Sequence, residues 1–240
     1  MSEGGSQDIG RRIEGKTSFE LELATLRRRI VREASMAIDM LESALLALWE
    51  LDSERANAVR RRDDRVDREE VAIEAECFRL LALQQPFGGD LRQIAFCIKV
   101  NEDIERVADH ASSIAKLTMR ISPPAPKWPT SLVEMGERVP LMCHSLLRAV
   151  LSEDVDAARE VIAGDKVIDR LDERLFDDVL DLLDLEPTRK ADVLLIHRLG
   201  RELERVGDLM VNIAEDVVYL VTGEIVRHEK KLKRDEKTGA

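Results

Sequence analysis

The feature that most constrains the fold of this chain is a duplicated pattern of helical segments. Apolar residues recur at spacings of three and four along 18–121 and again along 130–228, which is the period of one face of an α-helix. Helix-breaking residues interrupt the two stretches at matching places, at Pro86 and at Pro187. The repeat predicts two copies of one three-helix unit, and long helices joined by short connections pack as antiparallel bundles.

The chain is therefore expected to be all-α, with six long helices that form two pseudo-symmetric antiparallel three-helix bundles. The Pro-rich stretch 122–129 predicts a stiff linker between the bundle of 18–121 and that of 130–228. Residues 1–17 are polar and predict a disordered extension, and 229–240 form a charged tail. The expected helices begin near Ser18 and then cover about 56–84, 91–117, 130–152 and 155–185, and a sixth follows the break at 186–188 and extends to about 228.

Composition agrees with long amphipathic helices and excludes several classes of protein. Aromatic residues make up 3% of the chain and charged residues 35%, which disfavours a β-sandwich. The net charge of −11 argues against direct nucleic-acid binding, which needs a basic face. We therefore expect partners other than nucleic acid.

Cysteines and apolar runs indicate a cytoplasmic protein. Cys77, Cys97 and Cys143 are odd in number, far apart and embedded in apolar helical pattern, so we expect reduced core residues. No apolar run is long enough for a membrane span, and the N-terminus lacks the apolar stretch of a signal peptide. Any contact with a membrane is expected to be peripheral.

A six-residue phrase occurs once in each half of the chain. Residues 104–109 read Ile-Glu-Arg-Val-Ala-Asp, and 203–208 read Leu-Glu-Arg-Val-Gly-Asp. In a helix, residues four apart lie on the same face, so each phrase places two carboxylates side by side. Like charges at this spacing destabilise a helix slightly, which indicates that something cationic offsets them.

A second acidic pair precedes the phrase in each half. The spacing is again four, at 63 and 67 and at 165 and 169. In an antiparallel bundle the start of one helix lies beside the end of the next, so we expect these pairs to meet the carboxylates of the phrases at one end of each bundle. The first carboxylate set is then Asp63, Asp67, Glu105 and Asp109, and the second carboxylate set is Asp165, Asp169, Glu204 and Asp208.

Four clustered carboxylates do not all stay ionised without positive charge nearby. Two solutions remain open from the residues alone. One is a salt-bridge network with the neighbouring arginines, and the other is a hard cation such as Mg²⁺, Ca²⁺, Mn²⁺ or iron, because oxygen ligands suit these ions. The arginines of the first solution are Arg65, Arg68, Arg106, Arg170 and Arg205.

Catalytic motifs that would accompany such carboxylates are missing from the sequence. None of the four histidines has Glu or Asp three residues before it, which disfavours an inward-facing di-iron centre of the ferritin-like kind. His110 adjoins Asp109 and is expected to be a surface histidine rather than a ligand. No Ser-His-Asp grouping and no phosphate-binding glycine loop appears, so catalysis is not expected.

At this level of detail the sequence resembles the PhoU family. The resemblance covers about 19–228. It rests on Asp-Asp-Arg-Val-Asp at 63–67, Gln-Gln-Pro-Phe-Gly-Gly-Asp-Leu-Arg at 84–92, Asn-Glu-Asp-Ile-Glu-Arg-Val-Ala-Asp-His-Ala at 101–111, Glu-Leu-Glu-Arg-Val-Gly-Asp-Leu-Met-Val-Asn-Ile-Ala-Glu at 202–215 and Val-Tyr-Leu-Val-Thr-Gly-Glu-Ile-Val-Arg-His at 218–228.

The resemblance implies a regulator of phosphate homeostasis without enzymatic activity. It implies a protein that relays phosphate sufficiency from the ATP-binding subunit of the phosphate ABC transporter to the sensor histidine kinase, and so represses phosphate uptake and the phosphate-starvation response. It also implies a homodimer, located in the cytoplasm and partly at the inner face of the membrane through its partners. Multinuclear metal binding by both carboxylate sets is implied too, with iron, zinc, manganese or magnesium as the metal.

One departure from the family pattern and two other functions belong beside this expectation. Gly200-Arg201 stands where the first half has Asn101-Glu102, so the second set has one acid fewer nearby. The first alternative is a metal-dependent enzyme on a carboxylate bundle, or a metal-storage protein. The second is a purely structural helical scaffold, for which neutralising the acids has no effect on signalling.

Overall fold

The computed structural model describes residues 4–226, with side chains from Ser18 onward, and this part of the chain is entirely helical apart from its connections. All-α architecture is thereby confirmed. The helices are α1 Gly4–Glu50, α2 Ser53–Gln84, α3 Gly89–Thr118, α4 Thr130–Ser152, α5 Val155–Leu185 and α6 Lys190–Thr222. Among the described residues no helix is both long and apolar enough to cross a bilayer.

The duplication is visible in the turns that join the helices. Asp52 caps the start of α2, accepting backbone hydrogen bonds from Glu54 and Arg55 at 2.9 Å, and Asp154 caps α5 in the same way. The residue before each cap has a left-handed backbone, with φ of 50° at Leu51 and 53° at Glu153. Because a short polar side chain at the N-cap satisfies free backbone N–H groups, both helices begin at the same point of the repeat.

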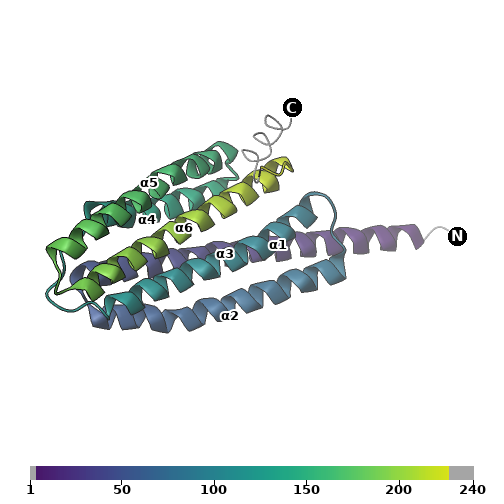
Figure 1. Cartoon of the computed structure of the whole chain (residues 1–240). Coiled ribbons are helices and arrows are strands. Elements are labelled where there is room, and N and C mark those ends of the chain that lie inside the picture. Colours follow the sequence, from purple (N-terminus) through teal and green to yellow (C-terminus); the bar gives the residue numbers. More distant parts are fainter. Residues whose placement is uncertain (1–3, 227–240) are drawn as a thin grey trace, which may run out of the picture.

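The two halves pack against each other along α3 and α6 (Figure 1). Lys99 of α3 bonds Asp216 of α6 at 3.0 Å, while His110, further along α3, meets Glu202, near the start of α6. Residue numbers therefore rise along one helix as they fall along the other, and the pair is antiparallel. The buried apolar side chains of all six helices form one continuous core, to which the two bundles both contribute.

The Pro-rich connection is held against both halves. Near the start of the connection, the carbonyl of Ser122 accepts a hydrogen bond from Arg189 at 2.7 Å. The backbone N–H of Ser122 donates one to Asp192 at 3.2 Å. Near its end, Trp128 packs edge-on against Trp49 of α1 with ring centroids 5.5 Å apart. These contacts set the path of the connection across the molecule.

Two expectations about helix ends were wrong. The first helix starts at Gly4 rather than near Ser18, so most of the stretch expected to be disordered is helical, although residues 1–3 lie outside the described part. No proline interrupts this stretch, and adding turns to an existing helix avoids the cost of nucleation. The sixth helix ends at Thr222 because Gly223 takes a left-handed C-cap conformation, with φ of 76°. The charged tail 229–240 lies outside the described residues.

Candidate functional site

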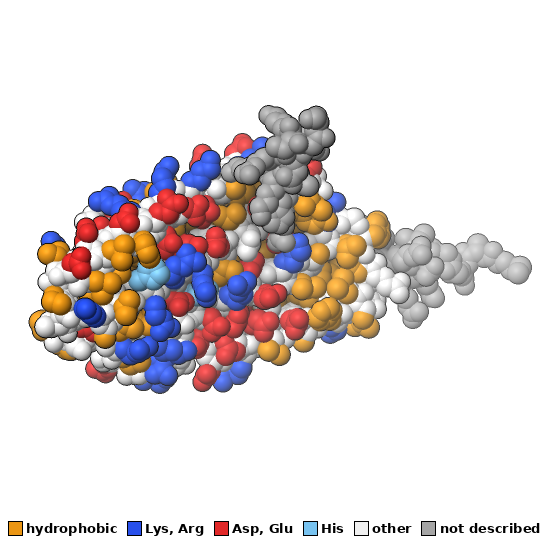
Figure 2. Space-filling view, in the orientation of Figure 1, with side chains coloured by type: hydrophobic (Ala, Val, Ile, Leu, Met, Phe, Trp, Pro, Cys, Tyr) orange, Lys and Arg blue, Asp and Glu red, His pale blue; other side chains and the backbone are white. Residues whose placement is uncertain are grey.

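The first carboxylate set comes together as the spacing predicts. Asp63 and Asp67 lie about three turns into α2, and the antiparallel α3 brings Glu105 and Asp109 beside them. Figure 2 shows acidic side chains gathered over the middle of α2 and α3. The set therefore lies along the helices rather than at a bundle end.

Burial and mutual repulsion act on this set. Burial raises the pKa of Glu105 to about 7, and the charges of Asp109 and Asp67 add to the rise. Burial likewise raises the pKa of Asp63; the Ser112 hydroxyl opposes that rise from nearby, but neither Ser112 Oγ nor Asp63 Oδ1 completes a well-formed hydrogen bond among the described residues. No lysine or arginine of the described residues forms an ion pair with the first set. The set is rich in acceptors and poor in cations.

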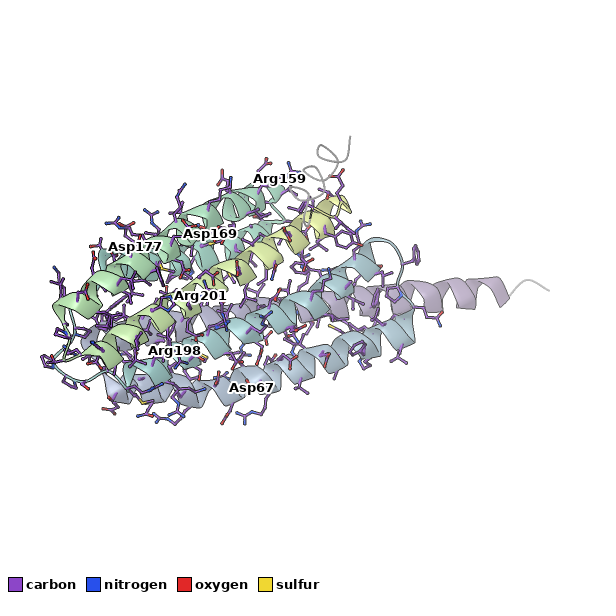
Figure 3. The ribbon with its side chains drawn as sticks, viewed as in Figure 1. Asp67, Arg159, Asp169, Asp177, Arg198 and Arg201 are labelled. Atoms are coloured by element: carbon purple, nitrogen blue, oxygen red, sulfur yellow. The ribbon has the colours of Figure 1, made fainter. Side chains whose placement is uncertain are left out.

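The second carboxylate set assembles in the same way on α5 and α6. Burial raises the pKa of Asp208, and the charge of Asp169 adds to it. Asp165 also faces α6, since a Cβ atom on Gly207 would lie 3.4 Å from its Oδ1. Figure 3 shows Asp67 on α2 and Asp169 on α5, the outer helices of the two halves, with α6 and its Arg201 between them.

Arg201 makes the second set different from the first. Its Nη1 lies 2.9 Å from Asp172 Oδ2 and 3.1 Å from Glu204 Oε1. Burial and Asp208 raise the pKa of Glu204, and Arg201 opposes the rise. The salt-bridge solution thus holds in part here, but through an arginine outside the group named from the sequence.

Sequence reasoning missed three residues at the two sets. Asp172 was missed although it follows Asp169 by three positions, on the same helix face, which was an available signal. Arg201 was noted as a substitution but not as a partner. Glu33, on α1, carried no local signal at all. The Arg106 of the first phrase pairs with Asp103 at 3.7 Å instead of with the phrase's own carboxylates.

Glu33 is fully buried at the junction of α1, α2 and α3. Burial raises its pKa to about 8, and the charges of Glu69 and Glu70 raise it further, while Arg29 opposes them. Neither carboxylate oxygen of Glu33 has a hydrogen-bond partner in the described part of the chain. The acidic cluster of the first half therefore extends from the surface into the interior.

His110 joins the two halves beside the repeated phrases. Its Nδ1 lies 2.7 Å from Glu202 Oε2, and both side chains are mostly buried. It was expected to be a surface histidine, so this expectation was wrong. The expectation failed because α6 covers the ring, which the sequence around His110 does not reveal. The contact joins the residue after Asp109 of the first set to a residue two positions before Glu204 of the second.

The donor chemistry of both sets fits a hard cation. Every carboxylate offers oxygen, and buried oxygens without a partner occur in each half, at Asp63 Oδ1 and at Glu204 Oε2. In the described residues, however, no three Asp, Glu, His or Cys side chains converge on a point where a metal ion would sit. A metal ion would therefore bind only after the carboxylate side chains had moved closer together.

The cysteines match the expectation of buried thiols. Cys77, Cys97 and Cys143 are all free and buried, and burial raises the pKa of each thiol to about 12. A thiol with so high a pKa holds its proton and is a poor nucleophile and a poor metal ligand. They belong to the core and not to the candidate site.

Comparison with known proteins places the chain in a family. The PhoU domain model matches residues 30–118 and 132–217, one match in each half. A PhoU homologue of Clostridium acetobutylicum, called a phosphate-specific transport system accessory protein, is 32% identical over 87% of this chain and 96% of its own length. The homologue of Pseudomonas aeruginosa is 34% identical over 88% of each chain, and the Escherichia coli protein is 29% identical over 93% of this chain and 92% of its own.

Solved structures agree with the sequence comparison. The crystal structure of PhoU from Pseudomonas aeruginosa superposes with a TM-score of 0.83 at 33% identity, covering 86% of this chain and all of that one. The PhoU structure from Streptococcus pneumoniae gives a TM-score of 0.81 at 30% identity, covering 87% of this chain and 99% of that one. With both repeats matched and the six-helix fold shared, the chain belongs to the PhoU family.

Proposed function

We propose that this protein is a non-enzymatic regulator of phosphate homeostasis that represses phosphate uptake and the phosphate-starvation response when phosphate is plentiful. The observation that carries the proposal is the match of both repeats to relatives named as accessory proteins of the phosphate-specific transport system. Its coverage matters, because the chain and these relatives correspond over nearly their whole length. The proposed role is therefore that of the complete relative and not of one shared module.

The proposed partners are the ATP-binding subunit of the phosphate ABC transporter and the phosphate-sensing histidine kinase. The protein would work as a homodimer in the cytoplasm and reach the inner face of the membrane through these partners. The name of the relatives supports association with transport-system components. The exposed part of the two carboxylate sets would meet basic surfaces of the partners, since complementary charge favours fast and specific encounter.

We also propose that the two carboxylate sets bind divalent or trivalent metal, with iron, zinc, manganese and magnesium as candidates. Asp63, Asp67, Glu105 and Asp109 would hold it in the first half, and the second set would do so in the second half. The support is the donor set, which is oxygen throughout, together with the unpartnered buried oxygens in each half. A bound cation would neutralise the clustered charge at each set.

Deleting the gene tests the regulatory role. Uptake of radiolabelled phosphate in phosphate-rich medium should rise in the deletion strain, because repression is lost, and should return to normal when the wild-type gene is restored. As a control, uptake is measured in phosphate-poor medium, where the two strains should differ little. Equal uptake of the two strains in rich medium would contradict the proposal.

Charge reversal tests docking through the carboxylate sets. A chain with Glu105→Lys and Glu204→Lys should retain neither the kinase nor the transporter ATPase in a pull-down. The control is Glu42→Lys, because Glu42 belongs to neither set and pairs with His144 of α4. Retention of both partners by the doubly reversed chain would rule out this docking surface.

Elemental analysis tests metal binding separately. Protein purified without added metal should contain metal, and the Asp109→Ala, Asp208→Ala double variant should contain much less. Equal metal content in the two proteins would show that the sets are not the sites. A content of many ions per chain would instead favour a storage role.

A further inference from the structure

Glu33 is the most unusual ionisable group among the described residues. It is fully buried in α1, and both of its carboxylate oxygens lack a hydrogen-bond partner there. Leaving a buried carboxylate unpaired is costly, so buried acids are normally paired, hydrogen-bonded or bound to metal. No described side chain hydrogen-bonds this carboxyl group, so either a proton or a bound cation neutralises it.

The neighbours of Glu33 supply acceptors rather than donors. The acids that act on its charge are Glu69 and Glu70 of α2 and Glu105 of α3. The nearby cation is Arg29, but its Nε is engaged with Glu69 Oε1 at 2.8 Å. The interior side of the first carboxylate set is thus short of positive charge.

A second buried oxygen belongs to the same layer of the bundle. Asn101 lies one turn before Glu105 on the same face of α3, and its Nδ2 donates to the Glu70 carbonyl at 2.9 Å. Its Oδ1 is buried without a partner among the described residues. Amide and carboxylate oxygens together are the ligand type of hard cations.

The second half provides an internal comparison. The capping residues Asp52 and Asp154 put α1 and α4 in register, with a difference of 102 in residue number. By that register, Met135 takes the place of Glu33, and it is fully buried too. The position is thus an ordinary core position in one half and carries a carboxylate in the other.

The same comparison applies to the surrounding residues. Gly200 stands where the first half has Asn101, so the amide oxygen is also missing there. Arg201 stands in place of Glu102 and already neutralises Asp172 and Glu204. At these three positions, 33, 101 and 102, the second half therefore has fewer oxygen ligands and one more positive charge than the first.

We infer that Glu33 is an additional, interior ligand of a hard divalent cation at the first carboxylate set, acting with Glu105 and the Asn101 side-chain oxygen. The first half then binds the cation more tightly than the second. This inference rests on the proposed metal binding and assigns it an unequal distribution between the repeats. A cation entering between α1, α2 and α3 would draw together carboxylates that otherwise repel one another.

Titration of the full-length, metal-stripped protein with Mn²⁺, followed by calorimetry and by the electron paramagnetic resonance of free Mn²⁺, tests the inference. Wild type should show a tighter and a weaker class of site. Glu33→Gln should weaken the tighter class about tenfold or more, because it removes a charged ligand and keeps the shape. Asp208→Asn should affect the weaker class alone, and Glu42→Gln should change neither.

Thermal unfolding separates a ligand role from a purely structural one. Glu33→Met copies the residue of the second half, so the metal-stripped variant should unfold at a temperature equal to or above that of wild type. The rise in unfolding temperature on adding Mn²⁺ should nevertheless be smaller than in wild type, because stabilisation by a ligand follows its affinity. A packing defect would instead lower the unfolding temperature of the metal-stripped variant.

Two results would overturn the inference, and they have different consequences. If both Glu33 variants bind Mn²⁺ as tightly as wild type, Glu33 is not a ligand, and the proposed metal binding by the two sets stands. If wild type binds no Mn²⁺, both the inference and the proposed metal binding fail. The proposed regulation of phosphate uptake is judged separately by the deletion strain.

Discussion

At the scale of single residues, the surroundings of each carboxylate decide its chemistry more than its place in a motif does. Glu105 and Glu204 hold the same position in the repeated phrase, yet of the two only Glu204 forms an ion pair with an arginine among the described residues. Glu33 belongs to no motif and is the most deeply buried acid of the first half. The residues that distinguish the two halves therefore lie outside the repeated phrases.

The raised pKa values of Glu33 and Glu105 predict a pH-dependent stability of the metal-free protein. An unfolded glutamate loses its proton near pH 4.3, whereas the folded state holds protons up to about 8 at Glu33 and about 7 at Glu105. The folded state then binds more protons between these limits, so the free energy of unfolding should fall as pH rises from about 5 to about 8. Urea unfolding in EDTA across this range measures the effect.

Glu33→Met provides the control for that pH dependence. Removing the carboxyl should flatten the fall in stability, since the groups that act on Glu33 from its own and neighbouring helices, Arg29, Glu69, Glu70 and Glu105, remain in place. A wild-type stability that is constant or rises over this range would contradict the assignment.

Removing Arg201 should destabilise the second half moderately. Arg201→Gln leaves Asp172 and Glu204 without their cation, and because the guanidinium is partly exposed we expect a loss of about 1 kcal/mol in the free energy of unfolding. Arg198→Gln is the matched control, since Arg198 is exposed three positions earlier on the same helix (Figure 3). A control variant as destabilised as Arg201→Gln would show that loss of charge alone, and not the pair, matters.

At the scale of helices, close packing depends on a few glycines. Gly136 lies inside α4 where Trp49 of α1 approaches, and a Cβ atom at this position would lie 2.6 Å from Trp49 Cζ2. The ring is rigid and also packs edge-on against Trp128, which restricts its movement. The glycine therefore sets how closely α1 and α4 approach.

Gly136→Ala and Gly164→Ala should change stability in opposite directions. The first should lower the free energy of unfolding by about 1–2 kcal/mol, because the clash with the indole outweighs the gain in helix propensity. The second should raise it by about 0.5–1 kcal/mol, since Gly164 lies mid-helix in α5 with open space around it. Urea unfolding of the two variants measures both, and equal signs would refute the packing explanation.

At the scale of the whole molecule, the two repeats form one structure rather than two independent bundles. One core runs through all six helices, and polar contacts tie α3 to α6 at His110–Glu202 and at Lys99–Asp216. Because the core is shared, unfolding one half would expose apolar side chains of the other. The two copies of the repeat are therefore expected to unfold together.

A double-mutant cycle should measure the link between the halves. His110→Ala and Glu202→Ala, made singly and together, should show a coupling of about 1 kcal/mol, because they are the two partners of one mostly buried hydrogen bond. Urea unfolding should follow a single transition in all four proteins. The link between α3 and α6 would be contradicted if the two single changes in the free energy of unfolding simply added up in the double variant, or if wild type unfolded in two transitions.

The sequence by itself determined the all-α class, the six helices, the duplication and the meeting of the two acidic pairs in each half. These follow from periodicity and from turn chemistry, which are local properties that a single chain carries. The resemblance to the PhoU family also rested on contiguous motifs. Helix ends were predicted less well: no proline interrupts the stretch after Gly4, so the first helix begins earlier than expected, and Gly223 ends the sixth helix at Thr222, before the apolar pattern stops.

Only the tertiary structure decided which side chains complete each site. Glu33 sits beside Ala34 in the sequence like any polar residue of an amphipathic helix, and it becomes interior because α2 and α3 close over it. Arg201 and His110 likewise acquire their partners from other helices. The physical reason is that burial and electrostatic interaction depend on distances between segments far apart in the chain, which no local spacing encodes.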